Sequence, residues 1–291
     1  MKNRTLFFLN CCLLCGCSQN IDITLPYEGK KLVMLCILSP DRVLSAQIDQ
    51  TYPPTGNIIF KTVSNAVIEV YENDKLIELL THTKNGIYES AKRLRPKIGY
   101  TYKIKARATG FPDLESDGAM IPLTPQVKNA TFTRINGNIL SLKIEDYPNQ
   151  ENQYSIQVLG TYQGNRVATN ASNLSRPDGI SDNCGFRGNQ NNFYYRDVCF
   201  DGNVLEASYS TTLYGTVQIV NSKGNYENKD CDQVFLIIRN VGKAYFDYYK
   251  FYPPEDIELA FREPVSRFYN LKGGYGLFSV YTEVSIPFLV K

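Results

Sequence analysis

The chain contains a single histidine, His82, among its 291 residues. A serine or cysteine hydrolase normally needs a histidine base oriented by a carboxylate. His82 lies between Thr81 and Thr83 near an expected exposed turn, which gives it no such context. Zinc sites draw on clusters of histidine and cysteine, and the cysteines beyond the N-terminal segment are dispersed. Both classes of enzyme site are therefore disfavoured.

The sequence also lacks an excess of charge of either sign. It carries 31 Lys and Arg against 29 Asp and Glu, and removal of Lys2 and Arg4 with the N-terminal segment leaves 29 of each. Nucleic-acid binding demands a basic face, so we expect no nucleic-acid partner. The glycine run at 273–276 lacks the lysine and the following helix of a phosphate-binding loop. No apolar run after the N-terminal segment approaches the ~20 residues of a membrane-spanning helix.

Paired carboxylates are harder to exclude, because a glycoside hydrolase needs only two acids. The pairs Glu145-Asp146 and Glu255-Asp256 lie beside turn residues and are interpreted as solvated loop charges. One region is rich in aspartate but lacks the spacing of an EF-hand loop, which leaves open only a weak calcium site. Its acidic residues are Asp178, Asp182, Asp197 and Asp201. We predict a protein that is not an enzyme, with no cofactor and no assigned metal ligand.

The N-terminal segment is the most informative part of the sequence. A basic start at 1–4 precedes an apolar run at 5–15, and Gly16 stands directly before Cys17. This pattern is typical of a secretory signal that is too short to span a bilayer. With a cysteine after the small residue it resembles a bacterial lipobox, which predicts a signal peptide at 1–16 and lipidation, including palmitate, of Cys17. About three acyl chains at ~0.8 kcal/mol per buried CH2 are enough for stable anchoring.

Four cysteines remain after the signal and the anchor are set aside. An exported chain lies where disulfides persist, and four cysteines allow three pairings. Cys36 falls within an apolar strand and is expected to be a buried free thiol. Cys184 and Cys199 flank a polar segment and are close in sequence, so we favour a disulfide between them, worth about 3 kcal/mol. Cys231 could form a disulfide with either of these cysteines in place of the other. The connectivity of Cys231 and of Cys36 is therefore open.

The sequence of the mature chain predicts a mainly β protein with two domains. We expect a tether at 17–30, a β-sandwich domain at 31–120 and a second antiparallel β domain at 121–291, either a sandwich or barrel-like. Period-two alternation is clear at 100–106, and short strands with turn residues between them are typical of a sandwich. The proline-rich segment 121–125 marks the boundary, because proline cannot donate to a strand ladder.

The second half contains three further signals. An Asn-Gly dipeptide at 136–137 predicts a hairpin between strands at 130–135 and 139–144. The segment 163–203 is a long polar excursion, and such a segment is uncommon in a compact domain unless it is functional or mobile. Tyrosines at helical spacing in 242–252 predict the one convincing helix, whose aromatic face is expected to pack against the sheet. A ligand-stacking role for that face is the alternative.

The polar excursion holds one dense aromatic cluster. Phe193, Tyr194 and Tyr195 stand beside Arg196. Aromatic and arginine anchors in a polar surround are what protein interfaces favour. We therefore predict that these four residues contact a partner or a ligand.

Two resemblances follow from these motifs. The order "Gly-x-Tyr, Gly-Tyr-Thr-Tyr-x-Ile, Gly-Phe" in 86–111 resembles immunoglobulin-like or transthyretin-like modules, in which a tyrosine at a strand start bonds nearby backbone. The end of the chain, together with the lipobox and the tyrosine-rich helix, resembles an outer-membrane lipoprotein family of the Bacteroidota, domain-of-unknown-function family 4249. The motif residues are Pro264, Asn270, Gly273, Gly274, Gly276 and Phe278.

The resemblance implies a modest function and no catalytic residues. Such lipoproteins look like companions of TonB-dependent outer-membrane transporters, so we expect an accessory or substrate-capture role, anchored in the outer membrane and facing the cell surface rather than the periplasm. A structural or adhesive surface lipoprotein is the alternative, and a carboxylate-based glycoside hydrolase is a remote one. The motif at 264–278 is itself expected to be a structural hairpin that closes the barrel or sandwich.

Overall fold

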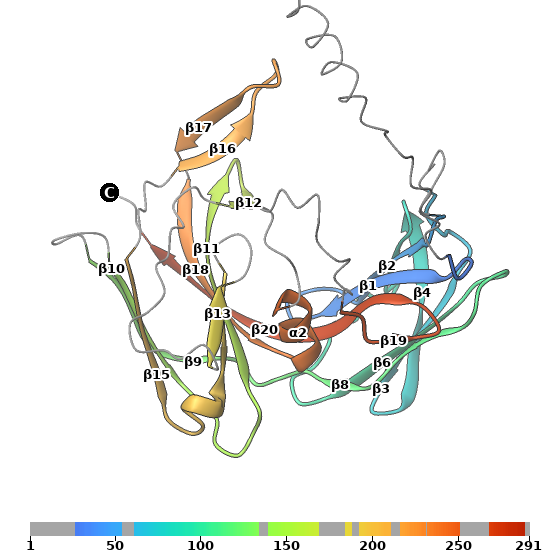
Figure 1. Ribbon diagram of the computed structural model, residues 1–291, viewed down its shortest axis with the longest axis horizontal. Helices are drawn as coiled ribbons and strands as arrows, with labels where there is room; N and C mark the ends of the chain where they lie inside the picture. The colour runs from blue at the N-terminus through green and yellow to red at the C-terminus, as the bar shows by residue number, and fades with distance from the viewer. Residues whose placement is uncertain are drawn as a thin grey trace, which may run out of the picture. The chain divides into compact units, whose positions relative to one another are not determined.

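The computed structural model describes residues 27–53, 61–133, 139–168, 184–187, 192–210, 216–230, 232–250 and 268–288. Every element below lies in one compact unit. The fold is mainly β, with sandwich-like antiparallel sheets and one short α-helix among the described residues, as the sequence predicted (Figure 1). The part of the chain described here contains no helix with the length and apolarity needed to span a membrane.

The first half folds into two packed layers. One contains β1 (Leu32–Leu38), β2 (Ser45–Gln50) and β5 (Ile87–Glu89); the other contains β3 (Val67–Glu72), β6 (Thr101–Arg107), β7 (Leu114–Ser116) and β8 (Ala119–Met120). The long strand β4 (Lys75–Lys84) pairs with β3 and, beyond a bulge, with β5, which joins the layers. Alternate residues of β1 and β6 are buried in one core, as the period-two pattern predicted.

Two tyrosines of this sandwich bond backbone groups, as the resemblance to immunoglobulin-like modules implied. The Tyr88 hydroxyl donates to the carbonyl of Val63 at 2.9 Å and accepts the N–H of Ala66 at 2.9 Å. The Tyr102 hydroxyl accepts the N–H of Lys97 at 3.0 Å. Both rings are buried, so these bonds satisfy loop backbone that would otherwise be unpaired in the core.

The second half builds a second core from two antiparallel sheets. One has the order β15 (Val204–Ser210), β10 (Ile139–Glu145), β9 (Gln126–Thr133). The facing sheet contains β11 (Gln153–Tyr162), β12 (Asn165–Ala168), β13 (Gly185–Arg187), β14 (Phe193–Arg196) and β18 (Gln233–Val241). Buried side chains of β10 pack against those of β11 and β18. The strands described here therefore form a sandwich-like pair of sheets, which favours the sandwich over the barrel-like alternative.

The two predicted local features of this half have different outcomes. β9 and β10 pair antiparallel, which confirms the hairpin, while its turn at 134–138 lies outside the described residues. The excursion 163–203 is partly structured, because it contains β12, β13, β14 and the 3-10 helix η3 (Asp197–Cys199). Residues 169–183 and 188–191 lie outside the described part. A further hairpin pairs β16 (Thr216–Val220) with β17 (Tyr226–Asp230).

The predicted helix is α2 (Lys243–Lys250), and its aromatic face packs inward. Tyr245 and Phe246 are buried in a small cluster with Tyr194 of β14 and Tyr281. Tyr249 stacks on Tyr194 with ring centroids 5.5 Å apart. These contacts confirm the packing interpretation of the tyrosines at 245–249.

The last strand, β20 (Tyr275–Phe288), belongs to both cores. Its first half pairs in parallel with β1, and its second half pairs antiparallel with β18 (red in Figure 1). Phe278 and Val280 accordingly lie in the first core, while Ile286 and Phe288 pack against the second. One strand therefore runs through both sheets, and the division at 121 stays a prediction.

The glycine motif shapes the entry into β20. After β19 (Leu271–Lys272), which pairs with β7, Gly273 adopts φ +79° and Gly276 φ +114°. A Cβ on Gly273 would collide with the carbonyl oxygen of Asp113, and one on Gly276 with that of Met34. The segment therefore needs glycine both for conformation and for close approach. The described part of the motif joins the two layers of the sandwich, because β19 pairs with β7 and β20 with β1. The expected hairpin over 264–278 stays a prediction, because Pro264 lies outside the described residues.

Candidate functional site

The aromatic cluster of β14 is core, which corrects its interpretation as a contact surface. Phe193, Tyr194 and Tyr195 are at most 2% exposed. β14 is paired on both sides, by β11 and β13, and both of its faces are covered. Phe193 and Tyr195 point into the second core, and Tyr194 points to α2. These three side chains are therefore not available to a partner in this fold.

Arg196, the fourth residue of that prediction, is partly exposed and holds α2 in place. Its guanidinium carbon lies 4.8 Å from the ring centroid of Phe246, and its Nη2 lies 3.5 Å from Oδ1 of Asp247. Both contacts join the end of β14 to the helix. Arg196 also lines a cavity described below.

The cysteines follow the pairing that the sequence favoured. Cys184 and Cys199 form a disulfide with Cα atoms 5.9 Å apart, which ties the start of β13 to η3. Cys36 is free and buried, and burial raises the pKa of its thiol to about 12. Such a thiol carries almost no nucleophilic thiolate at neutral pH. Cys231 and the anchor residue Cys17 lie outside the described residues.

Two cavities lie side by side along residues 149–153. The first, which we call the amide cavity, has a volume of about 610 Å³ and is walled by β8, the start of β11, the end of β18, α2 and β20. The second, the acidic cavity, has a volume of about 510 Å³ and is lined by 149–151, 196–198 and Asp201. Gln150 and Glu151 line both. The two cavities therefore share one wall.

A chain of hydrogen bonds connects the two cavities. Asn240 Nδ2 donates to Asn152 Oδ1 at 3.0 Å and to the carbonyl of Leu123 at 3.1 Å. The backbone N–H of Asn152 donates to the Asp197 carboxylate, and the N–H of Asp197 donates back to the Asn152 carbonyl at 3.2 Å. Asn152, Asn240 and Asp197 are all buried. This network fixes the shared wall.

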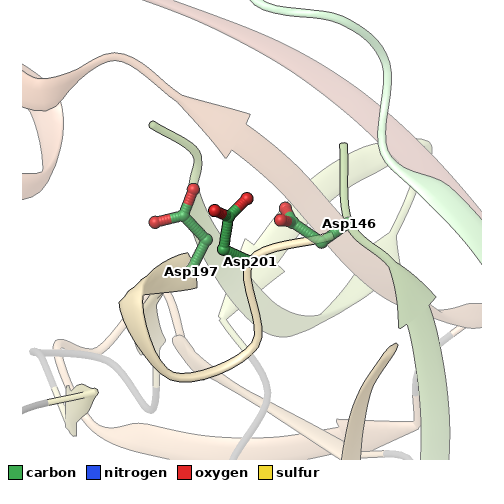
Figure 2. Close-up of side chains that lie close together, drawn as sticks. All are labelled: Asp146, Asp197 and Asp201. Carbon is green, nitrogen blue, oxygen red and sulfur yellow. The ribbon is translucent and has the colours of Figure 1, made fainter. Parts of the chain in front are cut away.

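Three carboxylates gather at the acidic cavity, and two of them line it. Their nearest oxygens lie within 4.8 Å of one another and belong to Asp146, Asp197 and Asp201 (Figure 2). Asp146 follows β10, Asp197 opens η3, and Asp201 lies in the turn after it. Asp146 is 2% and Asp197 6% exposed, whereas Asp201 is exposed. The interpretation of Asp146 as a solvated loop charge is therefore wrong.

Hydrogen bonds explain why these carboxylates are tolerated. Asp146 accepts the Tyr154 hydroxyl at 2.7 Å and the N–H of Gly202 at 3.0 Å. Burial is the largest influence on Asp197, and the neighbouring carboxylates Asp146, Asp201 and Glu151 add to it, so the pKa of Asp197 is raised. The hydrogen bond from Asn152 opposes that rise.

The cluster offers two kinds of chemistry. Carboxylate oxygens are ligands that Ca²⁺ prefers, but Ca²⁺ takes 6–8 of them. Asp146 already accepts two hydrogen bonds with its two oxygens. A carboxyl whose pKa is raised within a group of carboxyls, as at Asp197, is also the pattern of a general acid. Sequence analysis missed the cluster because Asp146 is distant in sequence from Asp197 and Asp201; only its position directly after a strand could have suggested it. The prediction of no metal ligand stays a prediction.

Comparison with known proteins places most of the chain in one sequence family. The family model described as "Domain of unknown function (DUF4249)" matches residues 18–286. The match begins one residue after Cys17 and ends within β20. A search among curated proteins finds no match to the chain.

Proposed function

The chain belongs to the DUF4249 family, and from that premise we propose that it is a lipid-anchored, non-catalytic outer-membrane protein that captures a ligand for a TonB-dependent transporter of a Bacteroidota cell. The lipobox-like segment that ends at Cys17 supports the anchor and the export route. A Cys-linked lipid places the protein at a membrane surface without a membrane-spanning segment. The lipid inserts into the outer membrane, and the folded part lies at the cell surface.

The observation that carries the capture role is the amide cavity. Ligand sites are concave, have volumes of roughly 300–1,000 Å³ and carry a few convergent polar groups. The amide cavity has a volume of about 610 Å³ and is lined by the buried amides of Asn152, Gln153 and Asn240. An amide side chain carries hydrogen-bonding groups but no nucleophile, which suits binding better than catalysis.

Affinity purification tests the partnership. The tagged full-length protein is purified from gently solubilised membranes, and the proteins that accompany it are identified. We expect a TonB-dependent transporter with the native chain, and we expect its loss with Cys17→Ala, which removes the anchoring thiol. A transporter-free preparation that instead carries envelope scaffold proteins would favour the structural or adhesive alternative.

The orientation is tested on intact cells. Protease added outside the cell should cut the folded domain of a surface-facing protein and leave a periplasmic control intact. Full protection of the chain until the outer membrane is permeabilised would place it on the periplasmic side.

One observation favours the remote alternative of a carboxylate-based glycoside hydrolase. Retaining glycosidases hold two carboxyl groups about 5–5.5 Å apart, and the aspartate cluster brings three carboxylates together with a raised pKa at Asp197. Against it, Asp146 is buried and braces the turn at Gly202. Release of product from chromogenic glycosides by the native chain, abolished in Asp197→Asn and Asp201→Asn, would establish the hydrolase; we expect no release.

A further inference from the structure

Two buried polar side chains that line the amide cavity have a side-chain oxygen without a hydrogen-bond partner among the described residues. Both N–H groups of the Asn240 amide are used, by Leu123 and Asn152. Its Oδ1 has no hydrogen-bond partner among the described residues, although Asn240 is 1% exposed. Ser279, from the neighbouring strand β20, lines the same cavity, is 1% exposed, and its Oγ is also unpartnered there. Buried acceptors without a donor are costly unless a ligand or water supplies one.

Among the described residues, the charges around the two cavities are unbalanced toward negative. Asp117 pairs with Lys272, with Nζ and Oδ1 2.6 Å apart. Asp247 is paired with both Lys243 and Arg196.

Three carboxylates have no ion pair within the described part of the chain. Glu151 accepts only an amide, from Gln153 at 2.9 Å, and it lies on the wall that both cavities share. Asp197 and Asp201 accept backbone N–H groups of the same loop. A ligand that spans this wall therefore meets uncompensated negative charge.

The amide cavity also contains an unpaired strand edge and apolar surface. The short strand β8 pairs with β6 alone among the described strands and lines the cavity. An extended peptide can add to such an edge through backbone hydrogen bonds. Met120 of β8 is 57% exposed, and together with Phe268 it offers apolar surface for the methylene stems of long side chains.

We infer that the two cavities form one binding site for a short cationic peptide segment, whose backbone lies along β8 and whose Lys or Arg side chain reaches Glu151 and the acidic cavity. The inference rests on the proposed capture function and names its ligand class. A donor-rich, positively charged ligand complements carboxylates, the Asn240 carbonyl and the Ser279 hydroxyl together. A neutral sugar would leave the carboxylates of the shared wall without a counter-charge.

Calorimetry on the detergent-solubilised full-length protein tests this inference. The probe is the blocked tetrapeptide Gly-Lys-Arg-Gly, with Gly-Gln-Gln-Gly as the neutral analogue and maltotriose as the sugar probe. We expect the cationic peptide to bind at least tenfold more tightly than either of the others. We expect its affinity to fall at least fivefold between 50 and 500 mM NaCl, because exposed charges are screened by salt.

Variants locate the site. Glu151→Gln should weaken binding at least fivefold and Ser279→Ala about threefold. Glu206→Gln is the matched control, because Glu206 is an exposed carboxylate that pairs with Lys143 on another sheet, and we expect it to bind like the native chain. Equal binding of the neutral analogue, tighter binding of maltotriose, or unchanged affinity in Glu151→Gln would overturn the inference.

The two proposals fail in distinguishable ways. If the transporter co-purifies but the cationic peptide does not bind, the ligand class is wrong and the transporter role stands. If the peptide binds at the Glu151 wall but no transporter co-purifies, the site stands and the transporter role is wrong.

Discussion

The side chain of Asn270 pairs with the backbone of Phe278 in both directions. Asn270 Nδ2 donates to the Phe278 carbonyl at 2.7 Å, and the Phe278 N–H donates to Asn270 Oδ1 at 2.9 Å. The first half of β20 pairs with β1 along one edge. Along the other edge, the Asn270 amide makes the hydrogen bonds that a neighbouring strand would make. An unpaired strand edge is prone to join another chain, and this residue covers it.

We expect Asn270→Ala to destabilise the protein by about 2–6 kcal/mol, because two backbone groups of a buried residue lose their partners at about 1–3 kcal/mol each. The free energy of unfolding in urea measures the effect. Asn225→Ala, at an exposed loop position between β16 and β17, serves as the control and should change stability by less than about 0.5 kcal/mol. Equal stability of the two variants would contradict the assigned role.

Gly276→Ala should prevent stable folding, whereas Gly164→Ala should not. Both glycines have positive φ, +114° and +76°. A Cβ would meet the Met34 carbonyl at Gly276 and nothing within 4 Å at Gly164. Strain alone costs about 1–3 kcal/mol, so the difference between the variants measures the steric clash. The readouts are soluble yield and the thermal unfolding midpoint; similar midpoints would show that β20 does not lie this close to β1.

Removal of the disulfide should destabilise the native state by about 3 kcal/mol, as expected for a closed loop of this length. The test is the double variant Cys184→Ser/Cys199→Ser. It removes a disulfide that joins cysteines 15 residues apart in the sequence. Reductant should lower the unfolding midpoint of the native chain by a similar amount and leave that of the double variant unchanged. If reductant left the unfolding midpoint of the native chain unchanged, the disulfide would not be formed in the protein.

Cys36 should resist alkylation until the protein unfolds. Burial raises the pKa of its thiol to about 12, so at pH 8 only about one thiol in ten thousand is ionised. Peptide mapping after iodoacetamide treatment should find Cys36 unmodified in the native protein and modified in urea. Rapid modification of the native protein would show that β1 opens readily.

Asp197→Asn should stabilise the protein at neutral pH in the presence of EDTA. The pKa of Asp197 is raised in the fold, chiefly by burial, so the folded state binds this proton more tightly than the unfolded state. Ionisation therefore lowers stability above the raised pKa, and stability returns as the pH falls through it. The gain from the substitution should be largest near pH 7.5 and vanish near pH 4, as measured by urea unfolding at both values.

Asp201→Asn is the matched control for that substitution, because Asp201 belongs to the same cluster but is exposed. We expect a smaller gain at pH 7.5, since solvent screens its charge. A loss of stability in Asp197→Asn would mean that the ionised carboxylate stabilises the fold, which would contradict the prediction.

Local sequence patterns determined several elements of this protein. Alternation at 100–106 gave β6, the tyrosine spacing gave α2, and nearness in sequence pointed to the disulfide between Cys184 and Cys199. The DUF4249 family was also recognisable from the sequence, because its motifs are short and occur in order. Each of these signals lies within a few residues of the feature it predicts.

Only the tertiary structure decided what covers each face and which distant residues meet. The sequence placed Phe193, Tyr194 and Tyr195 in a polar excursion, but they form a strand, and their burial depends on α2 and the opposite sheet. Asp146 joins Asp197 because the turn after β10 lies against η3. Periodicity encodes which residues share a face, whereas exposure and charge clustering depend on contacts between segments far apart in the chain, which no local pattern carries.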